Sequence, residues 1–111
     1  MDDRIDLAFT LKMLDVDVVP LNFLHPLSGT PLEDQIPLTP REALKIISAF
    51  RFVLPDKEIK IAGGRERNPR DLQSWMFYAV ANSTMIGNCL TTTGRKVEDD
   101  FQMSKDLGLK F

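Results

Sequence analysis

The clearest pattern in the chain is an alternation of polar and apolar positions over residues 58–62. Two faces alternate along it, with Glu58, Lys60 and Ala62 on one side and Ile59 and Ile61 on the other. A period of two residues predicts a strand, and its isoleucine face needs a helix to cover it. Gly63 and Gly64 follow directly, so the chain can turn with a positive φ or let other backbone approach closely.

Apolar spacing of three and four residues predicts two helices before this strand. The first covers residues 2–14 and begins with aspartates that can serve as its cap. The second runs from Thr39 to about Val53, because Thr39 followed three residues later by Glu42 forms a capping box, with a proline in the first turn.

Two further helices are predicted after the strand. One opens at Asn68 as cap and continues to residues 79–81; its apolar face comprises Leu72, Trp75, Met76 and Ala79. The other covers residues 97–107 and stops at Gly108. Its apolar spacing is set by Val97, Phe101, Met103 and Leu107.

Two more apolar segments read as strands. Residues 16–24 form a run rich in β-branched side chains, typical of a buried parallel strand, although Pro20 removes one hydrogen-bond donor. Asn22 lies near the carboxyl end of this segment and shares a face with Pro20. Residues 83–87 give a short third strand, and the proline-rich loop 25–39 is long enough to cover a site.

Three strands alternating with helices predict an α/β fold with parallel pairing. A three-stranded parallel sheet leaves unpaired edges, and 111 residues are less than half of a complete eight-stranded barrel of roughly 250 residues. We therefore predict that residues 1–111 form a single partial domain, the carboxyl-terminal part of a (β/α)8 TIM-type barrel.

Composition and charge exclude several classes of protein. The charge of −2 gives no general attraction to nucleic acid, and no segment is apolar enough over its length to predict a membrane helix. The acidic start is unlike a secretory signal, which favours the cytoplasm. Cys89 is the only cysteine, so it excludes an internal disulfide and is interpreted as a small buried side chain.

Several motifs stand in register at residues 18–26, 29–33, 61–66, 81–83 and 87–92. Together they resemble the carboxyl-terminal part of biotin synthase. The resemblance implies a radical enzyme that inserts sulfur into dethiobiotin with S-adenosylmethionine, a 4Fe-4S cluster and a 2Fe-2S cluster. It also implies a homodimer and an end module shared with thiamine-synthesis enzymes.

The resemblance carries over to four residues. It implies that Asn22 faces the barrel interior near dethiobiotin, and that Leu24 and His25 lie near the adenosine of S-adenosylmethionine. Lys60 matches the position of an arginine that ligates the auxiliary 2Fe-2S cluster in many members. Because lysine must lose its proton before it binds a metal, two alternatives remain open: a cation that stabilises the anionic cluster without binding it, and a barrel lysine paired with Glu58. No catalytic residue is assigned.

The chain lacks the CxxxCxxC motif that holds the radical-generating cluster of this family. We therefore expect a truncated chain that is inactive without the missing amino-terminal half of the barrel. The alternatives are a noncatalytic α/β interaction module, or another radical S-adenosylmethionine enzyme with the same end domain.

Overall fold

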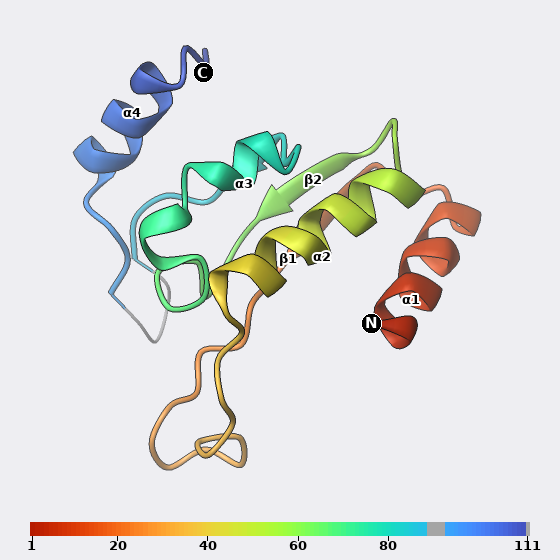
Figure 1. Ribbon diagram of the computed structural model, residues 1–111, viewed down its shortest axis with the longest axis horizontal. Coiled ribbons are helices and arrows are strands. Elements are labelled where there is room, and N and C mark those ends of the chain that lie inside the picture. The colour runs from red at the N-terminus through yellow and green to blue at the C-terminus, as the bar shows by residue number, and fades with distance from the viewer. Residues whose placement is uncertain (89–92, 111) are drawn as a thin grey trace.

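The computed structural model describes residues 1–88 and 93–110. It is an α/β fold in which helices and three parallel strands alternate, as the sequence predicts (Figure 1). The interpretation of Cys89, and part of the threonine-rich loop, fall outside the described residues. Within the described ranges, no helix is both long enough and apolar enough to cross a membrane.

The first two helices form where the sequence predicts them. Helix α1 spans Asp2–Met13 and α2 spans Pro40–Val53. The capping box is present, because the Thr39 hydroxyl accepts from the Glu42 backbone N–H and the Glu42 carboxylate accepts from the Thr39 N–H. The expected aspartate cap of α1 is absent; its aspartates lie inside the first turn, where they complement the helix dipole instead.

The sheet contains β1 (Val18–Leu21), β2 (Glu58–Ile61) and β3 (Ser83–Thr84) in the order β1-β2-β3. Both pairings are parallel, which confirms the predicted topology. Pro20 pairs opposite Lys60 on an edge strand, where a missing donor costs little. β1 and β3 are shorter than the predicted segments 16–24 and 83–87, because regular pairing stops where the loops begin.

The apolar core lies between one face of the sheet and α2. Figure 1 shows α2 lying across β1 and β2, with α1 beside it. The core centres on Val19, Phe23, Ala43, Ile46, Ile47, Phe50, Ile59 and Ile61. The opposite face of β1 is open, since Val18, Pro20 and Asn22 are exposed. The expectation that this strand is covered on both sides is therefore wrong for the described residues.

The third predicted helix is broken. Residues 70–72 form a 3-10 turn, η1 (Arg70–Leu72), and α3 is only Trp75–Tyr78. Positive φ angles of 49° at Arg70 and 73° at Val80 interrupt helical geometry at either end. Met76 is the one fully buried member of the predicted apolar face, whereas Trp75 is 57% exposed.

Helix α4 spans Val97–Asp106 and ends before Gly108, as predicted. Its buried face differs from the expected apolar one. The two buried residues of α4 are Asp100 and Ser104, whereas Val97 and Phe101 are exposed. The reason is a buried cation contributed by another part of the chain, Arg65.

Candidate functional site

The carboxyl ends of β1 and β2 are joined through Asn22. Its side-chain Oδ1 accepts a hydrogen bond from the backbone N–H of Gly63 at 2.9 Å, and the Phe23 N–H donates to the Gly63 carbonyl at 2.9 Å. Asn22 is exposed on the open face of the sheet. Its amide nitrogen has no hydrogen-bond partner among the described residues, so it can donate to a ligand placed there.

The glycine turn after β2 makes this junction possible. Gly64 has a φ of 80°, and a Cβ at this position would lie 1.9 Å from the Phe23 carbonyl oxygen. A side chain cannot fit in that space. Both properties expected of the glycine pair, a positive φ and a close backbone approach, therefore occur at one residue.

A buried amide holds the loops that leave the two strands. Asn68 is fully buried, and its Oδ1 accepts from the Leu38 N–H at 2.9 Å. Its Nδ2 donates to the carbonyls of Leu24 at 3.0 Å and Gly64 at 2.7 Å. The prediction that Asn68 caps a helix is wrong, because its side chain is engaged with three backbone groups elsewhere. Sequence reasoning gave no signal of this role beyond the presence of an amide after the glycine turn.

Lys60 occupies the open face between the two flanking strands. By register it lies beside Pro20 on β1 and Ser83 on β3. The proposed partner Glu58 instead accepts a hydrogen bond from the Ser83 hydroxyl at 2.7 Å. Within the described part of the chain Lys60 forms no ion pair, so the Glu58 alternative is not supported.

Two of the four predicted site residues share a cavity. A hollow of about 490 Å³ is lined by Asn22 and Leu24 together with side chains of α1, α2 and residues 35–38. His25 is half-buried and, like Lys60, does not belong to this lining. The structure thus brings Asn22 and Leu24 together, and sets Lys60 on the same sheet face as Asn22 by strand register.

An ion-pair cluster fixes the residues that follow the glycine turn. The Arg65 guanidinium is 2% exposed and forms a bidentate pair with Asp100 of α4, including an Nη1 to Oδ1 hydrogen bond of 2.9 Å. It also donates to the Gln73 side chain at 3.2 Å, and its Nε lies 3.6 Å from Glu66. Arg65 thus pairs with its sequence neighbour Glu66, but Asp100 is the principal partner, and no local sequence pattern indicates it.

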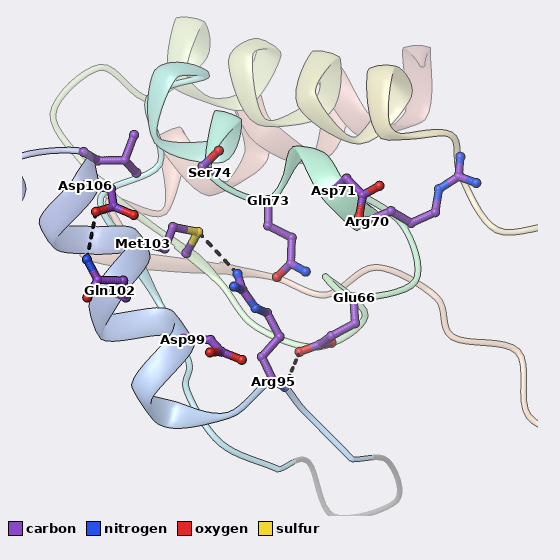
Figure 2. Close-up of a pocket in the computed structure, with 11 residues that line it drawn as sticks. Glu66, Arg70, Asp71, Gln73, Ser74, Arg95, Asp99, Gln102, Met103 and Asp106 are labelled. Atoms are coloured by element: carbon purple, nitrogen blue, oxygen red, sulfur yellow. Dashed lines mark hydrogen bonds between the residues drawn. The ribbon is translucent and has the colours of Figure 1, made fainter.

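A second cavity, of about 660 Å³, lies between residues 66–74 and α4 (Figure 2). Arg95 extends into it, donating from its side chain to the Met103 sulfur at 3.4 Å and from its backbone to Glu66 at 3.3 Å. Its guanidinium lies 3.6 Å from Asp100. Arg95 thus connects Glu66 to Met103 and Asp100 of α4, and it helps to anchor α4 to the rest of the fold.

Metal ligands are sparse. No group of three or more His, Cys, Asp or Glu side chains in residues 1–88 and 93–110 is arranged to hold a metal ion. Lys60 offers a single nitrogen, and a cluster needs several thiolate or equivalent ligands. The described residues therefore do not form a complete iron–sulfur site.

Comparison with known proteins shows the family of the chain. The family model described as Biotin and Thiamin Synthesis associated domain matches residues 20–110. Biotin synthase of Geobacter sulfurreducens is 59% identical over 108 residues, covering 97% of this chain and 33% of the relative. That of Geotalea daltonii is 61% identical over 106 residues, covering 96% and 32%, and that of Carboxydothermus hydrogenoformans is 54% identical over 110 residues, covering 99% and 34%.

The alignment with these relatives falls on their carboxyl-terminal part, and the chain spans about a third of their length. The matched residues include both strand ends, the glycine turn and α4. This chain belongs to the Biotin and Thiamin Synthesis associated domain family.

Proposed function

We propose that the chain is the carboxyl-terminal segment of a biotin synthase and forms one wall of the site in which sulfur is inserted into dethiobiotin. The observation that supports this is the open sheet face, where Asn22 presents an unpaired amide donor beside the glycine turn. Dethiobiotin carries carbonyl and carboxylate oxygens that accept such a bond. The barrel is completed by an amino-terminal segment, and the whole enzyme is a cytoplasmic homodimer.

In this proposal the segment shapes a site without supplying its cofactors. Leu24 and His25, which follow β1, lie beside the adenosine of S-adenosylmethionine. In the whole enzyme the 4Fe-4S cluster would supply the electron that cleaves S-adenosylmethionine to methionine and a deoxyadenosyl radical, and the 2Fe-2S cluster would supply the sulfur. Because the described residues lack a cluster ligand set, we assign them no chemical step, and Lys60 serves as a cation near the auxiliary cluster.

The proposal is tested by joining this chain to the amino-terminal part of the Geobacter sulfurreducens biotin synthase, in place of that enzyme's matching third. We expect the chimera to form biotin and residues 1–111 alone to form none. In the chimera, Asn22→Ala should raise the KM for dethiobiotin by about tenfold, because one hydrogen bond to the substrate is lost. A correctly folded, cluster-loaded chimera without biotin formation would refute the proposed function.

Lys60 is tested in the same chimera. Lys60→Met keeps the side-chain length but removes the charge, so we expect the 2Fe-2S cluster to stay bound with a lower reduction potential. Lys45→Met on the exposed side of α2 is the matched control and should leave the potential unchanged. Loss of the cluster would indicate direct coordination, and an unchanged potential and turnover would make Lys60 an ordinary barrel residue.

A further inference from the structure

Asn68 connects three backbone segments that are distant in sequence. Its amide group accepts from the Leu38 N–H and donates to the carbonyls of Leu24 and Gly64, at distances between 2.7 and 3.0 Å. The residue is fully buried. Both amide hydrogens and the oxygen are thereby used within the protein, so Asn68 cannot contact a ligand directly and must act through the groups it binds.

Those groups are the two ends of one loop. Leu24 precedes residues 25–37 and Leu38 follows them, so a single side chain closes the base of the loop. The hydrogen bonds within the loop join its own residues, as when Thr30 N–H donates to the Leu27 carbonyl at 3.2 Å. The third group, Gly64, belongs to the turn that Asn22 also contacts through Gly63. Asn68 therefore sets the position of the loop base relative to both strand ends.

We propose that Asn68 is a positioning residue for S-adenosylmethionine, holding the backbone at Leu24 and His25 and the base of loop 25–37 in the conformation that receives the adenosine. This inference rests on the proposed function, in which those two residues lie beside the adenosine. The amide is suited to the task because one planar group supplies two donors for carbonyls and one acceptor for an N–H.

Aspartate at this position tests the donors specifically. In Asn68→Asp the shape is kept and the acceptor for Leu38 remains, but a carboxylate then faces the carbonyl oxygens of Leu24 and Gly64. Those oxygens lose their donors and meet a negative charge. Asn68→Ala removes all three hydrogen bonds without adding charge, and it keeps the test decisive if the aspartate variant does not fold. Ile47→Val, on the buried face of α2, is a control for general destabilisation.

The experiment uses the complete chimera described above and has two readouts. Hydrogen exchange at the Leu38 amide should be about tenfold faster in Asn68→Ala, which removes the acceptor oxygen, and unchanged there in Ile47→Val. The Kd for S-adenosylmethionine, measured by calorimetry, should rise about tenfold with a change in kcat below about threefold, because the adenosine contributes to binding away from the reacting atoms.

The two failures are distinguishable. If the unaltered chimera binds S-adenosylmethionine but makes no biotin, the proposed function fails while the Asn68 measurements still apply. If the chimera makes biotin and the Asn68 variants leave the Kd unchanged, the positioning role is refuted. Unchanged exchange at Leu38 in Asn68→Ala refutes it as well, whatever the activity. A Kd that rises equally in Ile47→Val reduces Asn68 to a structural residue.

Discussion

Breaking the buried pair between Arg65 and Asp100 should detach α4 from the fold. Each side chain is 2% exposed. Two unit charges 2.9 Å apart attract by about 6 kcal/mol at an effective dielectric constant of about 20, and the cost of removing both from water offsets most of this. The pair as a whole therefore adds little stability. Removing one partner is different, because the other stays buried and keeps only a longer ion pair of 3.6 Å, to Glu66 for Arg65 or to Arg95 for Asp100.

Asp100→Asn keeps the size of the side chain and removes its charge. We expect a loss of about 3–5 kcal/mol in the free energy of unfolding, the usual cost of breaking a buried pair. Domains of this kind have total stabilities of about 5–15 kcal/mol, so the change is large. Asp99→Asn is the matched control, because it makes the same chemical change on the exposed side of α4 and should cost less than about 0.5 kcal/mol.

The measurement is urea unfolding of residues 1–111, followed by helical circular dichroism and by fluorescence of Trp75. This single tryptophan lies close in sequence to Gln73, which binds Arg65. Repeating the titration at several protein concentrations separates unfolding from association. Replacing both partners, as in Arg65→Met with Asp100→Leu, should restore most of the lost stability. Equal effects of Asp100→Asn and Asp99→Asn would refute the reasoning.

Three further outcomes are expected. The pKa of Glu42 lies below its ordinary value of 4.5, because the Thr39 hydroxyl and then the Thr39 backbone N–H donate to its carboxylate. The stability that the Glu42 carboxylate contributes is therefore present above pH 4.5 and lost as the pH falls through the folded-state pKa. The free energies of unfolding of the unaltered chain and of Glu42→Gln should converge in acid, and a difference between them that does not change with pH would contradict this. Gly64→Ala should cost about 1–3 kcal/mol more than Gly29→Ala in thermal unfolding, since both glycines have positive φ but only Gly64 is crowded; equal losses would count against the steric argument. Residues 1–111 alone should associate in sedimentation experiments through the open sheet edges, and a monomer at all concentrations would show that the segment completes its own core.

Local patterns predicted the helices and strands whose signals are contained in a few residues. The capping box at Thr39 and Glu42 needs only three residues of separation, and it forms as written. The alternation at residues 58–62 placed β2 correctly, and the glycine pair after it predicted the close approach at Gly64. Each of these features is formed by residues that are close together in the chain, so a local sequence pattern is enough to predict it.

Contacts between distant residues overrode the local pattern elsewhere. The apolar spacing of α4 predicted a buried Phe101, but the helix turns Asp100 inward to meet Arg65, which lies 35 residues earlier. The sequence around Asn68 predicts a helix cap, yet its side chain binds the backbone of Leu24 and Leu38. The helix predicted to begin there is interrupted. Periodicity carries no information on such partners.

Polar side chains fix the carboxyl ends of the strands for a physical reason. Apolar packing needs both surfaces to be covered, and the open face around Asn22 must leave room for what it binds in the proposed function. Hydrogen bonds and ion pairs need only one well-placed partner. Asn22 and Asn68 can therefore hold the glycine turn, and Arg65 can anchor the residue after it, without filling that face. Substitutions in the core between α2 and the sheet should therefore lower the free energy of unfolding and leave the geometry of the open face unchanged. Substitutions at these polar residues should change the geometry of the open face before they lower stability.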